Sequence, residues 1–244
     1  MAPLVGAAFL VTMATSALAQ SLLVKELDIV AERYHENPSR LDTLREGLEE
    51  AIKANAQEET LVALSRVSFI WGDVRATTRE QKLEAYDRGR QAAMRAVGLN
   101  AKNVAAHFWY ATNAGRWAQA RGVLQSLFLL STLREEIQTV LNLDPKFTAV
   151  YSLAGYVALE TPRFIGGDPD QAEAMFRKGL EQDPKFTGMR VGLAKTLIKK
   201  GQISEARQEL QTVLAEGQPS NLADWTVKDT REARELLESL KESS

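Results

Sequence analysis

The sequence predicts an all-α protein built as an array of antiparallel helix pairs. Three observations carry this prediction. The pentapeptide DPKFT occurs twice, at Asp144 and again 39 residues later at Asp183. Two stretches with apolar residues at helical spacing lie between the copies, and no stretch of useful length alternates apolar and polar residues as a strand does. A period of this size is typical of repeated helix-turn-helix units.

Residues 149–160 and 170–182 form the clearest expected pair. The first stretch, AVYSLAGYVALE, ends at a Thr-Pro dipeptide, and the second resumes an apolar face. Pro145 and Pro184, inside the two DPKFT copies, stop one helix and set φ for the next. Each copy is therefore expected to be the corner between successive helix pairs.

The pair also follows the tetratricopeptide pattern of aromatic, small and large apolar residues, at Tyr151, Ala154, Gly155, Ala172, Phe176, Gly179 and Pro184. The next unit repeats the pattern without an insertion at Leu193, Ala194, Gly201, Ala206 and Leu210. Helices about 8–10 Å apart leave no room for a large side chain where they cross. We therefore expect Gly155 opposite Ala172, and Ala194 opposite Ala206, in a degenerate tetratricopeptide-like α-solenoid.

The remaining elements are looser copies of this unit. They are one or two capping helices over 22–54, a pair over 58–73 and 79–99, a pair over 99–117 and 131–143 with about ten extra residues, and an amphipathic closing helix over 228–244. The length and the ordinary globular composition predict that residues 20–244 form a single domain or one continuous array.

The first nineteen residues have the properties of an export leader. They carry no charge and finish in Ala17-Leu18-Ala19, the small-x-small pattern read by a signal peptidase. The basic residues that usually begin such a leader are missing, which leaves open an uncleaved segment that anchors the protein to the membrane. The leader predicts an exported, periplasmic protein.

Composition argues against most catalytic and nucleic-acid functions. The formal net charge is −2 and the sequence pI about 5.9, so no bulk positive field attracts nucleic acid. Cysteine is absent and only two histidines occur, which disfavours thiol chemistry and histidine metal sites. No phosphate-binding loop or serine elbow is present. The sequence predicts no enzyme activity, cofactor or metal.

One expected helix concentrates aromatic residues. His107, Phe108, Trp109 and Tyr110 are consecutive, and at about 100° per residue they cannot all face the core. One interpretation is a pocket for a small hydrophobic or carboxylate ligand, with Arg116 binding the carboxylate, lined by Trp109, Tyr110, Asn113, Arg116 and Trp117. The alternative is that most of these aromatics fill the core between repeats.

Two further segments are candidates for contacts. In RFIGGDPDQA, Gly166 and Gly167 permit a sharp loop and Asp168 is placed to cap the next helix; the loop is either functional or a simple turn. The stretch 121–137 holds the densest apolar run, and Leu124, Leu127 and Phe128 are candidates for an oligomer contact. The alternative is an ordinary central helix.

Several motifs in order resemble the T component family of tripartite ATP-independent periplasmic (TRAP) transporters: AHFWYATNAGRWAQARGVL, an LDP corner, PRFIGGDPDQAEAMFRKGLEQDP and DWTVKDTREARELLESL. The resemblance covers roughly residues 30–240. It implies an exported homotrimeric accessory protein that contacts a periplasmic solute-binding protein and helps to deliver a small hydrophobic or acidic ligand. The alternative function is a general periplasmic scaffold that binds other proteins.

Overall fold

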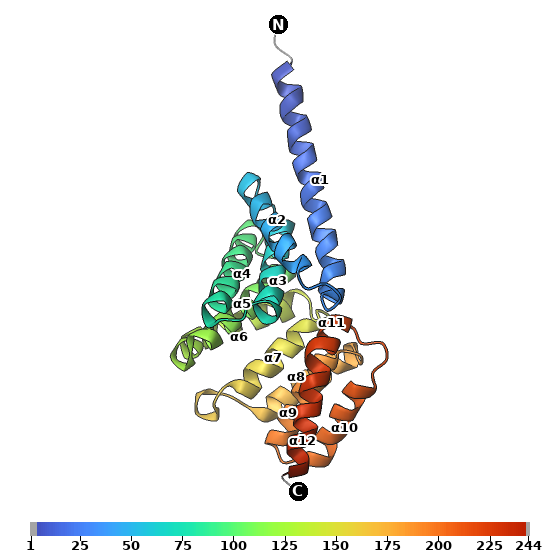
Figure 1. Ribbon diagram of the computed structural model, residues 1–244. Coiled ribbons are helices and arrows are strands. Elements are labelled where there is room, and N and C mark those ends of the chain that lie inside the picture. Colours follow the sequence, from blue (N-terminus) through green and yellow to red (C-terminus); the bar gives the residue numbers. More distant parts are fainter. Residues whose placement is uncertain (1–3, 243–244) are drawn as a thin grey trace. The chain divides into compact units, whose positions relative to one another are not determined.

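The computed structural model describes residues 4–242, without the side chains of 4–17, 123–126 and 242. Every regular element in this part of the chain is a helix, which confirms the all-α, tetratricopeptide-like array (Figure 1). The chain divides into two compact units, Met1–Ser131 and Thr132–Ser244. Each is described by itself below, and the expectation of a single domain over 20–244 stays a prediction.

The N-terminal unit is a layer of first helices backed by second helices. Its elements are α1 (Leu4–Arg33), α2 (Arg40–Ala54), α3 (Glu58–Val74), α4 (Arg79–Leu99), α5 (Val104–Arg121) and the start of α6 (Val123–Leu143). Helix α3 packs closely against α4 and α4 against α5, while α3 also contacts α1 and α5. Helices α1, α3 and α5 thus follow one another in one layer, with α2 and α4 behind them.

Hydrogen bonds of Gln20 join helix α1 to α2 and α3 of this unit. Gln20 is buried, its amide donates to the carbonyls of Ala51 (3.2 Å) and Asn55 (3.0 Å), and its oxygen accepts from the Thr60 hydroxyl (3.0 Å). It therefore adds side-chain hydrogen bonds to the end of α2, where the Ala51 carbonyl also accepts from the Asn55 N–H and the Asn55 carbonyl from the Gln57 N–H. The expected leader ends one residue before this anchor. Side chains of most of that leader lie outside the described residues, and its export and cleavage stay predictions.

The two DPKFT copies form the same turn. In the first, the Asp144 carboxylate accepts from the Lys146 backbone N–H at 2.8 Å; in the second, Asp183 accepts from Lys185 at 3.0 Å. The backbone N–H of each following phenylalanine also donates to the aspartate carbonyl. These are Asx turns, which aspartate favours. The repeated pentapeptide therefore forms the same turn between successive helix pairs at both positions, as expected.

The C-terminal unit contains α7 (Ala149–Glu160), the 3-10 turn η1 (Arg163–Ile165), α8 (Pro169–Gln182), α9 (Thr187–Lys199), α10 (Ile203–Ala215), α11 (Leu222–Asp224), the π-helical turn η2 (Trp225–Asp229) and α12 (Thr230–Glu242). Helix α7 packs on α8, α8 on α9, and α9 on α10. The turn between α9 and α10 is made at Gly201 with φ +77°, a conformation that favours glycine.

The core of this unit is centred on Phe176 of α8. A Cβ at Gly155 of α7 would lie 2.6 Å from its ring, and one at Gly192 of α9 would lie 2.5 Å from it. The three heavy atoms nearest to a Cβ at Gly155 all belong to Phe176, so this ring fills the space at the α7 crossing. A contact between Gly155 and Ala172 stays a prediction. Ala194 and Ala206, also expected to meet, belong to different buried clusters.

Two expected boundaries differ from the structure. The ten extra residues of the 99–143 segment lengthen both helices: α5 runs to Arg121, α6 begins at Val123, and only Gly122 with φ +117° separates them. The closing helix, expected over 228–244, begins as the π-helical turn η2, which apolar periodicity at 3.6 residues does not reveal.

Candidate functional site

Helix α5 carries a half-exposed aromatic and cationic face where it lies beside α3. The Trp109 ring is 5.6 Å from the ring of Phe69 on α3, between centroids, and 5.0 Å from that of Phe108. The Arg116 guanidinium lies 5.8 Å from the Phe69 ring centroid. Trp109 and Arg116 are seven residues apart, about two helical turns, so they project from the same side of α5. We call Phe69, Trp109 and Arg116 the α3–α5 face.

An aspartate behind this face fixes the arginine. Asp73 of α3 is only 9% exposed in its side chain; it pairs with Arg116 at 3.1 Å and accepts from the Tyr86 hydroxyl at 2.7 Å. Burial, together with the Asp73 charge, raises the pKa of Tyr86 far above its ordinary range. Tyr86 therefore remains a donor to Asp73 at any physiological pH, and Arg116 keeps its place while its own side chain is 45% exposed.

The other expected pocket residues lie elsewhere on α5. Asn113 is fully buried and its amide donates to the Ser65 carbonyl (3.1 Å) and hydroxyl (3.0 Å) of α3. Trp117, turned about 100° from Arg116, faces Arg90 of α4. Tyr110 is half-buried. The structure thus brings Trp109 and Arg116 together and separates them from Trp117, and small-ligand binding by this set stays a prediction.

The α3–α5 face combines two aromatic rings with one arginine. Aromatic and arginine side chains supply most of the energy at protein interfaces, because they combine large apolar area with donors held in a fixed geometry. Phe69 and Asp73 were not among the expected site residues. Their spacing of four on α3 was the available signal, but nothing in a single sequence pairs α3 with α5.

The Gly-Gly loop forms as expected around Asp168. Gly166 has φ +91°, Asp168 accepts from the Asp170 N–H at 2.9 Å, and Pro169 is the first residue of α8. The Arg134 guanidinium donates to the Gly166 carbonyl at 2.7 Å. Phe164 on η1 is 86% exposed beside these contacts. The geometry explains each residue as part of a turn, and a functional role for the loop stays a prediction.

Gly167 offers a sharp test of this loop. A Cβ there would lie 1.8 Å from the Thr161 carbonyl oxygen, so Gly167→Ala must displace backbone. We expect a loss of about 1–3 kcal/mol in the free energy of unfolding, the usual cost of overpacking, measured by urea titration. Gly217→Ala is the matched control, because nothing lies within 4 Å of its Cβ position. Equal stability of the two variants would contradict this loop geometry.

The apolar run is part of α6. Phe128 is 77% exposed and Leu127 is 37% exposed, whereas Leu133, Ile137 and Val140 farther along the helix are buried. The Leu124 side chain lies outside the described residues. An oligomer contact through this segment stays a prediction.

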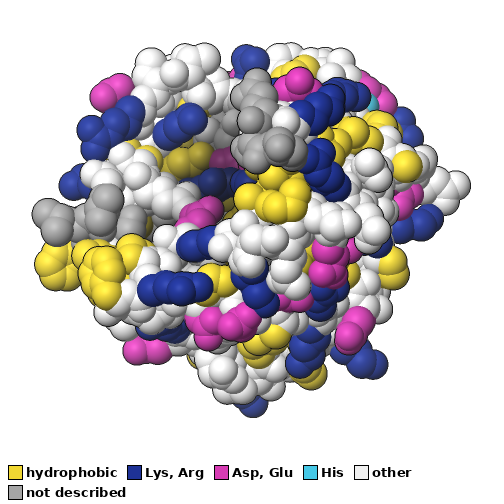
Figure 2. Space-filling view, turned by 90° about the horizontal axis from the view of Figure 1, so that it is seen from below, with side chains coloured by type: hydrophobic (Ala, Val, Ile, Leu, Met, Phe, Trp, Pro, Cys, Tyr) yellow, Lys and Arg dark blue, Asp and Glu magenta, His cyan; other side chains and the backbone are white. Residues whose placement is uncertain are grey.

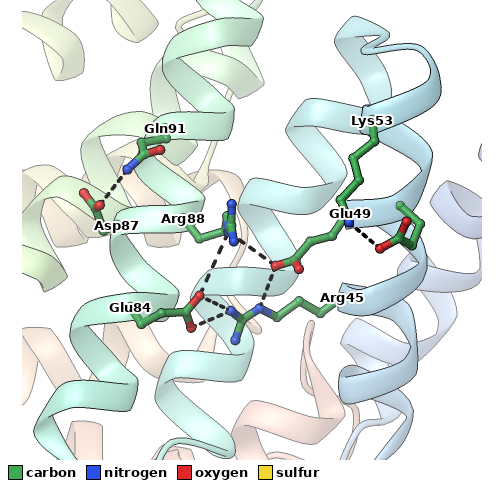
Figure 3. A network of polar contacts seen from close by, with 8 residues as sticks. Arg45, Glu49, Lys53, Glu84, Asp87, Arg88 and Gln91 are labelled. Atoms are coloured by element: carbon green, nitrogen blue, oxygen red, sulfur yellow. Dashed lines mark hydrogen bonds and ion pairs between the residues drawn. The ribbon is translucent and has the colours of Figure 1, made fainter.

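A charge network joins α2 to α4 on the second-helix side of the N-terminal unit (Figure 3). Arg45 of α2 bonds Glu84 at 2.5 Å and pairs with Glu49 at 3.4 Å, and Arg88 of α4 reaches Glu49 at 3.4 Å. The Arg45 side chain is only 12% exposed and lies 4.6 Å from the Trp71 ring centroid. Two guanidinium groups and two carboxylates thus form ion pairs that link α2 to α4.

Two features are absent from the described part of the chain. In that part, no helix is both long and apolar enough to span a membrane, and no three acidic or histidine side chains are grouped to hold a metal ion. On the face drawn in Figure 2, Lys and Arg side chains are interspersed with Asp and Glu.

Two family models match the chain. One, described as regulator of microtubule dynamics protein 1-3, covers residues 23–160, and a tetratricopeptide repeat model covers residues 164–224. No match was found among curated proteins.

Several solved structures share the fold. A thermophilic tetratricopeptide protein of Thermus thermophilus is 19% identical with a TM-score of 0.66, over 90% of this chain and 100% of that one. PilF of Pseudomonas aeruginosa is 15% identical with a TM-score of 0.56, over 93% of each chain. MamA of Desulfovibrio magneticus RS-1 is 14% identical with a TM-score of 0.50, over 79% of this chain and 94% of that one. At these identities the likeness concerns the fold alone.

These matches overturn the resemblance to the TRAP T component family. The motifs that carried it were the aromatic cluster with Gly-Arg-Trp, the Leu-Asp-Pro corner, the Gly-Gly-Asp loop and the closing helix. In the structure they are ordinary helices and turns of a helix-pair array, a fold class that is not specific to one family. That resemblance alone implied the transport role, the solute-binding partner and the homotrimer. These three predictions are therefore no longer supported.

Proposed function

The chain belongs to the regulator of microtubule dynamics protein 1-3 family, and on this premise we propose that it is a protein-binding module with no catalytic activity of its own. Its partner binds the layer of first helices in the N-terminal unit. The observation that carries the proposal is the α3–α5 face, where Phe69, Trp109 and Arg116 are gathered on two adjacent helices.

The proposal is supported by the way this face is built. Helix arrays present extended surfaces on which partners bind, and the tetratricopeptide match in the C-terminal unit is to an array of this class. Arg116 is held by Asp73 before any partner arrives, so little side-chain entropy is lost on binding. The α2–α4 network of Figure 3 is a poorer candidate, because the side chain of its central Arg45 is only 12% exposed, against 45% for Arg116.

Site-specific photo-crosslinking tests the proposal in the cells that make the protein. Phe69→p-benzoylphenylalanine keeps a ring at the centre of the face, and irradiation is expected to give one discrete adduct of higher mass. The control is the same amino acid at Gln91, which is exposed on α4 and should give no such adduct.

Competition separates a specific partner from random contact. Excess unlabelled wild-type protein should suppress the adduct, whereas an excess of the Arg116→Glu variant should not, because the reversed charge opposes any partner that recognises the guanidinium. Adducts of the same kind at both positions, or none at Phe69, would contradict protein binding through this face.

A further inference from the structure

A second cationic cluster surrounds Trp117 at the C-terminal end of α5. The Arg121 guanidinium lies 4.7 Å from the centroid of the Trp117 ring, and the Arg90 guanidinium, from α4, lies 5.4 Å from it. Trp117 is half-buried, and Arg121 is exposed. Cations over an indole ring are attracted by its quadrupole, so the ring holds both guanidinium groups in place.

A third arginine is fixed at the same helix end. Arg79, at the start of α4, donates to the carbonyls of Ala120 (2.7 Å) and Arg121 (3.0 Å). The last carbonyls of a helix lack intrahelical partners and carry partial negative charge, which explains why a guanidinium sits there. Arg90 and Arg121 thus share the Trp117 ring, and Arg79 lies on the last carbonyls of the same helix.

The cluster is not neutralised by the protein itself. Arg90 pairs with Asp87 at 2.6 Å. Gln91 donates to the other oxygen of that carboxylate at 2.6 Å (Figure 3). Arg79 and Arg121 form no ion pair with any side chain that the structure describes. The connected group thus holds three cations and one carboxylate, unlike the balanced α2–α4 network.

The position of Arg121 over the Trp117 ring leaves its guanidinium donors available. An arginine that lies over a ring uses its face, while its five N–H donors stay at the rim of the plane, where they can bind a carboxylate bidentately. Arg121 is the exposed member with all of these donors uncommitted to a carboxylate. We propose that the Arg90–Trp117–Arg121 surface binds an acidic segment of a protein partner, through carboxylates that face Arg121 with Arg79 and Arg90 beside it.

Carboxylates fit this surface better than a lipid or nucleic-acid phosphate. Segments that recognise anionic lipid headgroups typically cluster about four to eight basic residues, more than the three found around Trp117. Nucleic-acid binding relies on a long positive field, and the chain as a whole has a formal net charge of −2. A short acidic segment matches both the small extent and the local sign of the cluster.

The test uses hexaglutamate peptide and the full chain. Tryptophan fluorescence is followed during titration, and Trp117→Phe identifies the signal that comes from this ring. Binding to the wild type is expected to weaken at least fivefold in Arg121→Gln. Arg95→Gln, which removes the same charge from an exposed position on α4, should leave binding unchanged. Raising the salt from about 0.05 M to about 0.5 M should also weaken binding, because it shortens the screening length.

The binding titrations either support the proposal or overturn it. Loss of binding confined to Arg121→Gln, with no binding of hexaglutamine, supports it. Equal binding by Arg121→Gln and Arg95→Gln overturns it, and so does binding of phosphatidylserine vesicles that depends on Arg121 while hexaglutamate does not bind. Arg121 makes no hydrogen bond through its side chain in the described structure, so this variant is expected to fold; circular dichroism checks that it does. The result is independent of crosslinking at Phe69, which concerns other residues.

Discussion

Phe176→Ala is expected to lower the free energy of unfolding by about 3–5 kcal/mol, the range for removing a buried phenylalanine. The ring is fully buried and meets the Tyr156 ring edge-on at 5.1 Å between centroids. It fills the space opposite two glycines, Gly155 and Gly192. Because neither glycine has a side chain that could move into the void, the cavity cannot easily collapse. Urea denaturation measures the loss.

A second substitution, Gly192→Ala, tests whether the Phe176 ring packs against α9. Gly192→Ala alone should destabilise the protein, since its Cβ would lie 2.5 Å from the Phe176 ring. In the Phe176→Ala background the same change should stabilise it, by up to about 1 kcal/mol, because the clash is gone and alanine is the better helix former. A Gly192→Ala effect of the same sign in both backgrounds would contradict the packing of Phe176 between α7 and α9.

Asp229→Asn is expected to raise stability at neutral pH by about 1–3 kcal/mol. Burial raises the pKa of Asp229 to about 6, although the hydrogen bond from the Thr187 hydroxyl (2.6 Å) lowers it and Asp224 raises it further. Two pKa units correspond to about 3 kcal/mol. The folded chain therefore favours the neutral acid, and ionisation of Asp229 opposes folding. Asparagine stays neutral and can still accept from Thr187.

The sign of the pH dependence follows from this shift. Below about pH 4 the acid is protonated in both states, so its contribution to stability is fully present. Between about pH 4 and 6 the folded state binds more protons, so stability falls as the pH rises through the folded pKa, and above it the loss is complete. Lys228 lowers the pKa and Glu232 raises it slightly. Urea titrations from pH 4 to 8 should show this decline in the free energy of unfolding of the wild type and a flatter profile for Asp229→Asn. If the two profiles run parallel, the result contradicts a buried Asp229 that ionises in this range.

Local features of the fold were predictable because they depend on neighbouring residues. The Asx turns of DPKFT, the Asp168 cap with Pro169 at the first helical position, and the left-handed Gly166 all follow from intrinsic preferences. Periodicity alone also located most helices of the C-terminal unit. These predictions required no knowledge of which helices are neighbours.

Tertiary contacts were not predictable in the same way. Trp109 and Arg116 share a face because they are two turns apart, but their partner Phe69 lies forty residues earlier in the chain. Trp117 differs from Arg116 by one residue and therefore contacts α4 in place of α3. The buried Gln20, which directly follows the expected leader, was missed for the same reason: its partners Ala51, Asn55 and Thr60 are distant in sequence.

The central claim is that a protein partner binds the α3–α5 face, and titration calorimetry with the partner trapped by crosslinking tests it most directly. Arg116→Lys keeps a cation beside Asp73 while it removes the planar guanidinium, and Phe69→Ala removes the ring. Each is expected to weaken binding tenfold or more, about 1.4 kcal/mol. Arg88→Lys, in the α2–α4 network, is the matched control and should bind as the wild type does. Wild-type affinity in both face variants, or an equal loss in all three, would contradict the claim.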